Sequence, residues 1–86
     1  IDYSRLEELA KSVAKDVKTD AAVARAVLTS IVHYLSVYPS VGILRLIDDI
    51  ARKTKADRRV IGIAIDALRS IGAIEVVDGA VVNLKR

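Results

Sequence analysis

The strongest candidate for chemistry in this sequence is a run of basic side chains. Five cations fall within the eight residues 52–59, and these are Arg52, Lys53, Lys55, Arg58 and Arg59. Arginine and lysine at this density can neutralise the phosphates of a nucleic acid without reading its bases. The alternative is a solvated helix surface, on which the cations pair with the carboxylates of Asp48, Asp49 and Asp57.

The charge balance along the chain points to the same region. Residues 1–44 carry five basic and five acidic groups, whereas residues 45–86 carry nine basic and six acidic groups, so the whole excess of +3 lies there. This favours an anionic partner near the second half of the chain. The start of a predicted helix at Arg58 adds backbone N–H groups that attract phosphate. Lys85 and Arg86 extend the candidate phosphate-binding set if they emerge nearby.

Other chemistries lack the residues that they need. The chain has no cysteine and a single histidine, His33, which we expect to be a core or interface residue and not a metal ligand. Asp48 and Asp49 are neighbours on a predicted helix and point in different directions, so they do not form a catalytic pair. Neither a glycine-rich phosphate loop nor a Ser/His/Asp set is present. We expect no enzyme activity, cofactor, metal or small-molecule substrate.

Composition also bears on the compartment. The absence of cysteine fits a cytoplasmic protein, and residues 1–20 are too highly charged for a signal peptide. The charge-free stretch 26–44 is interrupted by a turn at Pro39, so we expect no membrane span. Few amides together with abundant isoleucine, valine and arginine suggest a thermophilic source.

Hydrophobic periodicity predicts four helices. Ser4 caps a first helix that begins at Arg5 and whose apolar stripe is Leu6, Leu9, Ala10, Val13 and Val17. Asp20 or Thr19 caps a second helix, which runs to about residue 37 and is apolar around most of its circumference, so we expect it to be central and buried. Tyr38 and Pro39 end it.

The second half of the chain continues the helical pattern and then changes period. Ser40 is predicted to cap a third helix over about 41–55, with an inward stripe of Leu44, Ile47, Ile50 and Ala51. Asp57 is predicted to cap a fourth helix over 58–71, which Gly72 ends. Apolar runs at 73–77 and 80–84 then flank Asp78-Gly79, which predicts a hairpin with a two-residue type I′ turn.

Residues 44–84 resemble the winged-helix branch of the helix-turn-helix superfamily, and small archaeal DNA-associated proteins have this look. Residues 46–55 are similar to its helix 2, 56–57 to the turn, 58–71 to the recognition helix, 71–75 to the step into the wing and 74–84 to the wing. Lys55 departs from the family, whose turn usually carries glycine here. The resemblance implies a mainly α fold with a small β-hairpin wing, in one domain over 1–86. Its parts are an added N-terminal helix (1–19), a helical core with the helix-turn-helix (20–72) and the wing (73–86).

The recognition helix is unusual for a base-reading element. In the family, bases are approached from the positions held here by Arg59, Val60, Gly62, Ile63 and Asp66. Of these side chains only that of Arg59 is of a type that reads base edges. Three interpretations of Val60, Ile63 and Ala67 are open: the N-terminal helix covers them, they form a protein interface, or they contact thymine methyl groups. We favour the interface, because an exposed apolar patch on a small domain usually marks one.

These observations lead to two main functional hypotheses. The first is an accessory or adaptor module of a DNA-transaction complex, in transcription or replication, that docks a protein partner through Val60, Ile63 and Ala67. It would touch double-stranded DNA only through phosphates, weakly and in a salt-sensitive way. The alternative is a homodimeric, sequence-specific transcription regulator, in which two such domains bind half-sites one helical turn apart. A protein scaffold that binds no nucleic acid is a third possibility.

Overall fold

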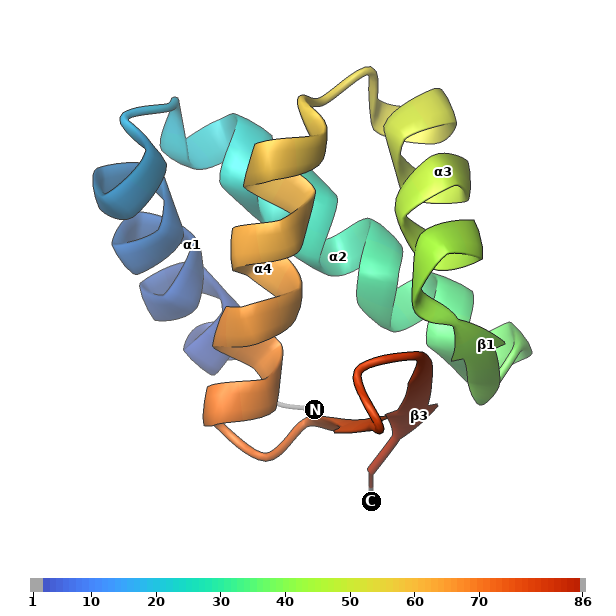
Figure 1. Cartoon of the computed structure of the whole chain (residues 1–86). Helices are drawn as coiled ribbons and strands as arrows, with labels where there is room; N and C mark the ends of the chain where they lie inside the picture. Colours follow the sequence, from blue (N-terminus) through green and yellow to red (C-terminus); the bar gives the residue numbers. More distant parts are fainter. Residues whose placement is uncertain (1–2, 86) are drawn as a thin grey trace.

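The computed structural model describes residues 3–85, which form four helices and a three-stranded antiparallel sheet (Figure 1). In chain order the elements are α1 (Tyr3–Val17), α2 (Ala21–Val37), β1 (Ser40–Gly42), α3 (Ile43–Thr54), α4 (Arg58–Ser70), β2 (Ile74–Val77) and β3 (Val81–Leu84). Helices α1, α3 and α4 all pack against α2, and the sheet lies beyond the C-terminal end of α4. The mainly helical class with a C-terminal hairpin is therefore confirmed.

Helix α1 buries the stripe that its periodicity predicts. Leu6, Ala10, Val13 and Val17 are buried, and Leu9 is half-buried against them. The helix begins at Tyr3, so Ser4 lies inside its first turn and does not precede it as predicted. Because α1 packs on both α2 and α4, the N-terminal helix shares the core of the rest of the chain.

Helix α2 is central, as expected, but it is not buried all around. Its buried face consists of Ala24, Val27, Leu28, Ile31 and Leu35. The opposite face is open to solvent, and Val23 on it is 41% exposed. Asp20 caps the helix by accepting a 2.8 Å hydrogen bond from the Ala22 N–H, and Tyr38 ends it, as predicted.

The residues after Pro39 form a strand and not the start of a helix. Ser40 was expected to cap α3, but it begins β1, and α3 starts at Ile43 with Gly42 as a cap that has no side chain to offer. The Ile43 N–H instead donates to the Ala80 carbonyl of the hairpin at 2.8 Å. A contact from the hairpin thus satisfies the Ile43 N–H where no side-chain cap is present, because leaving a backbone donor unpaired within the fold is unfavourable.

The inward face of α3 differs from the predicted stripe. Leu46 and Ile50 are buried and Ile47 is half-buried, whereas Leu44 is 73% exposed. Leu44 and Leu46 lie about 160° apart around a helix, so only one of them can face the core, and it is Leu46, four positions before Ile50. The prediction that Leu44 lies in the core is wrong.

Helix α4 and the hairpin follow the prediction closely. Asp57 caps α4, which ends one residue earlier than predicted, at Ser70, and Gly72 then takes a left-handed φ of 76°. Asp78 and Gly79 both have positive φ, as a type I′ turn requires, and the Ala80 N–H donates to the Val77 carbonyl at 3.0 Å. Since Val77 pairs with Val81, the loop holds three residues and not two.

The sheet has the order β1-β3-β2, which joins two distant parts of the chain. Strand β3 pairs antiparallel with β2 and with β1, so that Val82 lies opposite both Val76 and Val41. The Leu84 N–H also donates to the Pro39 carbonyl at 2.8 Å. The hairpin is therefore fixed to the segment between α2 and α3.

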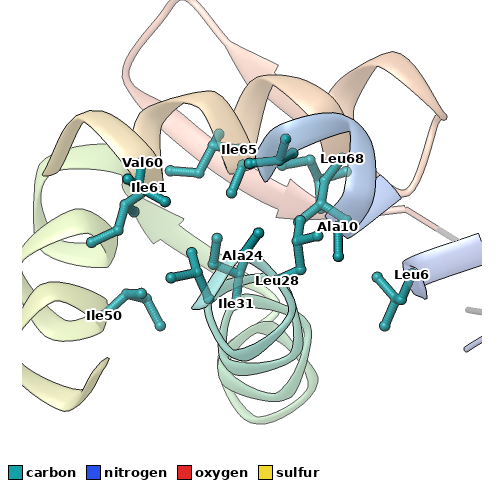
Figure 2. Close-up of a cluster of buried hydrophobic side chains, with 14 of the residues drawn as sticks. Leu6, Ala10, Ala24, Leu28, Ile31, Ile50, Val60, Ile61, Ile65 and Leu68 are labelled. Atoms are coloured by element: carbon teal, nitrogen blue, oxygen red, sulfur yellow. The ribbon is translucent and has the colours of Figure 1, made fainter. Parts of the chain in front are cut away.

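One aliphatic core holds these elements together. Figure 2 shows side chains from all four helices converging, among them Leu6, Leu28, Ile50, Ile61 and Ile65. Within residues 4–85 no polar or charged side chain is buried. Burial of each large aliphatic side chain stabilises the fold by about 1.5–3 kcal/mol, so this core carries the stability of a domain that has no cross-links.

Candidate nucleic-acid interface

The predicted basic cluster lies on the tight connection between α3 and α4. Lys55 follows the last residue of α3 with a left-handed φ of 63°, and its N–H donates to the Ala51 carbonyl at 2.9 Å. The Thr54 hydroxyl donates to the Ile50 carbonyl at 2.7 Å and accepts from the Ala56 N–H at 3.2 Å. These bonds fix the turn, so the cations on either side of it project from a defined backbone.

Four of the five cations are exposed and make no ion pair among the described residues. They are Arg52, Lys53, Lys55 and Arg59. We call these four residues the basic corner. Arg58 differs from them, because its guanidinium forms an ion pair with Asp48 of α3. The alternative interpretation, a helix surface of paired charges, therefore holds for Arg58 alone.

The other two nearby carboxylates have partners of their own. Asp49 accepts a 2.5 Å hydrogen bond from the Tyr34 hydroxyl of α2 and lies 3.7 Å from the Arg45 guanidinium. The Asp49 carboxylate, through this bond, raises the pKa of Tyr34, and burial raises it further. Asp57 caps α4. Each of the three carboxylates around the basic corner thus has a partner within the fold, while the four cations are exposed and have no ion-pair partner among the described residues.

The N-terminus of α4 is capped by the side chain of Asp57. The Asp57 carboxylate accepts a 2.8 Å hydrogen bond from the Arg59 N–H. A carboxylate at this position satisfies the backbone donor and repels an incoming phosphate. The Arg59 N–H is therefore already satisfied, and a phosphate at this helix N-terminus would have to compete with the Asp57 carboxylate, whereas the side chains of the basic corner have no such competitor.

Lys85 does not extend the basic corner. Its N–H donates to the Ala73 carbonyl at 3.0 Å, just past the C-terminal end of α4, whereas the basic corner lies at the N-terminal end. A helix of this length separates the two by about 20 Å. Figure 1 accordingly shows the α3–α4 connection at the top of the molecule and strand β3, which Lys85 follows, near the bottom. Arg86 lies outside the described residues.

The apolar side of α4 is largely covered by the chain itself. Val60 is 8% exposed and belongs to the core, and Ile63 and Ala67 are half-buried against it. Both α1 and α2 pack on α4. The expectation of an exposed apolar patch is wrong for Val60, and the interpretation in which the chain covers these side chains fits their burial.

The solvent face of α4 carries few groups that read bases. Asp66 lies 3.8 Å from Arg69 in an ion pair on this face, and Gly62 has no side chain. Arg59 lies in the first turn of α4 and has no ion-pair partner among the described residues. This face can therefore offer cations, but it lacks the amide side chains that pair with adenine.

Two surface features were missed by reasoning from the sequence. Leu44 and the outer strand residues Val77 and Val81 are exposed, and a shallow hollow lies beside them between the start of α3 and the hairpin turn. The exposure of the two valines could have been predicted from the alternation of side chains along a strand, since Val77 and Val81 pair across the outer face of the sheet. In addition, His33 is exposed on α2, so of the two places expected for it, the core or an interface, the core is wrong.

Comparisons with protein families, with curated proteins and with solved structures found no match to this chain. Among the described residues, no helix combines the length and apolar character that crossing a membrane requires. Nor do three or more histidine or acidic side chains gather within residues 3–85 as ligands for a metal ion. The function of this chain must therefore be inferred from the geometry and charge of its own surface.

Proposed function

We propose that this protein is a winged-helix-type accessory module that binds double-stranded DNA through its phosphates, without reading sequence, as part of a DNA-transaction complex. The observation that carries the proposal is the basic corner, in which Arg52, Lys53, Lys55 and Arg59 are exposed and free of ion pairs among the described residues. Cations that have no ion-pair partner in the fold remain available to an external anion.

The arrangement of elements supports the winged-helix resemblance. Helices α3 and α4 and their connection correspond to the helix-turn-helix segment, and β2 and β3 stand in the place of the wing. Lys55 takes the left-handed conformation for which glycine is usually chosen. A lysine at such a position gives up some stability relative to glycine, as Lys18 does at the α1–α2 connection.

Sequence-independent contact is favoured over base reading. Phosphates are bound by lysine and arginine at any sequence, while base edges need a helix face with several suitable donors and acceptors. On α4 the free polar group near the turn is Arg59, and Asp66 adds a charge of the wrong sign. The hairpin turn, Asp78-Gly79, offers no cation for a neighbouring groove.

The protein-docking part of the expected function has less surface than predicted, since Val60 is buried and Ile63 and Ala67 are half-buried against the core. We therefore do not extend the proposal to a partner seated on α4. The experiment below separates this proposal from a homodimeric, sequence-specific regulator, which would select one discrete sequence.

The test compares two variants with the same net charge. In the first, the four residues of the basic corner are replaced by glutamine. In the second, four exposed cations of the first helix and its end are replaced in the same way, namely Arg5, Lys11, Lys15 and Lys18. Affinity for a labelled 20-base-pair duplex of mixed sequence is measured by fluorescence anisotropy at several salt concentrations.

We expect the wild type to show a slope of log affinity against log salt of about −3 to −4, as four phosphate contacts require. The basic-corner variant should lose most of this slope and bind at least tenfold more weakly at low salt, whereas the control variant should retain the slope. Equal losses in both variants would mean that net charge alone attracts DNA and would overturn the proposal. Enrichment of one discrete sequence from a random duplex pool would instead support the regulator.

A further inference from the structure

A hollow of about 280 Å³ adjoins the basic corner on the outer side of α2. Its lining comes from α2 and from the last turn of α3, and consists of Thr29, Ser30, Val32, His33, Ser36 and Lys53. Lys53 also belongs to the basic corner, so the two features share a side chain. We call this feature the α2 hollow.

The polar groups of the α2 hollow are largely unused by the fold. Thr29, Ser30 and His33 make no side-chain hydrogen bond among the described residues, and Lys53 makes no ion pair there. Ser36 is the exception, because its hydroxyl donates to the His33 carbonyl at 2.6 Å. The hollow therefore offers two free hydroxyls, one imidazole and one ammonium group.

The spacing of these residues explains why they face one place. Thr29, His33 and Ser36 are separated by four and three positions, which puts them on one face of a helix. This face lies on the opposite side of α2 from the buried stripe, which faces the core and includes Ala24, Leu28 and Ile31. No acidic side chain lines the hollow. Hydroxyl, imidazole and ammonium donors without a carboxylate suit an anion rather than a cation or an apolar ligand.

We infer that the α2 hollow binds a backbone phosphate of a nucleic acid and so extends the phosphate-contacting surface from the α3–α4 turn onto α2. The inference rests on the proposed function, since Lys53 joins the hollow to the basic corner. Hydroxyl side chains and lysine are common donors to backbone phosphates, and together they position the duplex without selecting its sequence. Free inorganic phosphate has the same chemistry and is the competing source of the ligand.

The experiment removes the hydroxyls and leaves every charge in place. The double variant Thr29→Val, Ser30→Ala keeps the side chains close in size, and Ser36→Ala is the matched control, because that hydroxyl already donates to the helix backbone. Affinity for the mixed 20-base-pair duplex is measured by anisotropy, and thermal unfolding verifies that each variant folds. In parallel, amide shifts of residues 29–36 are followed by NMR with the duplex and with inorganic phosphate at matched ionic strength.

We expect the double variant to bind the duplex three- to tenfold more weakly with an unchanged salt slope, and Ser36→Ala to bind as the wild type does. We also expect residues 29–36 to shift with the duplex at concentrations at which inorganic phosphate has no effect. Shifts of the same size with inorganic phosphate alone would mean that the hollow binds free phosphate and would overturn the inference that its ligand is a nucleic acid. If the double variant binds normally while the basic-corner variant is weakened, the inference on the hollow fails and the proposed function stands. If neither variant is weakened, both fail.

Discussion

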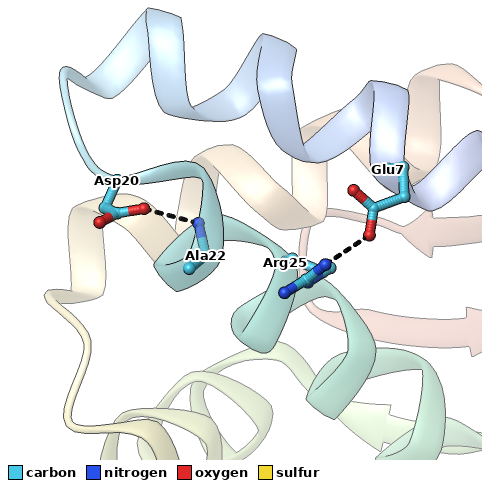
Figure 3. Close-up of polar contacts among 4 residues, drawn as sticks. All are labelled: Glu7, Asp20, Ala22 and Arg25. Atoms are coloured by element: carbon cyan, nitrogen blue, oxygen red, sulfur yellow. Dashed lines mark hydrogen bonds and ion pairs between the residues drawn. The ribbon is translucent and has the colours of Figure 1, made fainter.

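The α1–α2 and α3–α4 connections have nearly the same backbone and very different charge. In each, a lysine with left-handed φ follows the first helix, and an aspartate two positions later caps the second helix: Lys18 and Asp20 in one, Lys55 and Asp57 in the other. Both aspartates accept a 2.8 Å hydrogen bond from the N–H two residues on, and Figure 3 shows the bond of Asp20.

The two turns differ in charge although their backbones are similar. Residues 15–22 carry two basic and two acidic groups, whereas the corresponding residues 52–59 carry five basic groups and one acidic group. The first turn forms with no excess charge, so the cations of the second are not needed to make the turn. This difference is the clearest sign that the basic corner serves something outside the fold, and it provides an internal control for each variant.

The largest expected effect comes from copying the charges of the second turn onto the first. Asp16→Lys, Ala21→Arg and Ala22→Arg, all at exposed positions, would give the first turn the cations of its counterpart. We expect the affinity for the mixed duplex at low salt to rise about tenfold or more and the salt slope to steepen by about 3. Anisotropy titrations measure both. The same three positions changed to glutamine are the control, and an equal gain there would break the comparison.

Removing the caps should change stability alike at both turns. Asp20→Ala and Asp57→Ala should each lower the free energy of unfolding by about 1 kcal/mol, as measured by urea denaturation. Replacement by asparagine, which caps equally well, should leave stability nearly unchanged. Of the two asparagine variants only Asp57→Asn should strengthen duplex binding, because it removes a negative charge from among the cations. Stronger binding by Asp20→Asn would argue against a local effect.

Glycine at the left-handed positions should separate stability from binding. Lys18→Gly and Lys55→Gly each relieve a strained backbone, offset in part by the greater freedom of glycine in the unfolded chain. We expect a net gain of about 0.5 kcal/mol in each, or a melting temperature higher by about 2–4 °C. Lys55→Gly alone should weaken duplex binding and reduce the salt slope by about 0.9. A loss of stability in either variant would contradict the strain assigned to these lysines.

The smallest effects concern the ion pairs that cross each turn. Glu7 and Arg25 join α1 to α2, with 2.7 Å between carboxylate oxygen and guanidinium nitrogen, and Asp48 and Arg58 join α3 to α4 (Figure 3 shows the first pair). The hydrogen bond from Arg25 to Glu7, and then the charge of Glu7, raise the pKa of Arg25. Both pairs are exposed, so double-mutant cycles followed by thermal unfolding should give small couplings that fade with added salt. A coupling larger than the loss of a cap would contradict this ranking.

The sequence predicts the helix ends better than the surfaces between them. Asp20, Asp57 and Gly72 each act on their own helix through bonds to residues a few positions away, and all three predictions are confirmed. Strand β1 could not be predicted in this way. Ser40-Val41-Gly42 is too short for a visible alternation, and it is a strand only because β3 pairs with it from a distant part of the chain.

In the candidate site, too, features set by neighbouring residues could be predicted from the sequence, whereas features set by the packing of distant elements could not. The grouping of five cations around one turn follows from their positions in the sequence, and the structure leaves Lys85 outside this group and pairs Arg58 with Asp48. The partner of each carboxylate does not follow from the sequence, because Asp48 and Asp49 each lie within reach of several cations. The packing of Tyr34 on α3 determines that Asp49 bonds to Tyr34 and Arg45, while Asp48 pairs with Arg58. The burial of Val60 likewise depends on how the other helices pack around α4.

The pairing of β1 with β3 has a consequence for the order of folding. Val41 and Val82 face each other across the sheet although they are 41 positions apart in the chain, and α3 and α4 both lie between them. Closing so long a loop has an entropic cost that short-range helical contacts avoid. The helices should therefore assemble first and the sheet last, with slow, late protection of the Leu84 amide from hydrogen exchange during refolding as the kinetic signature.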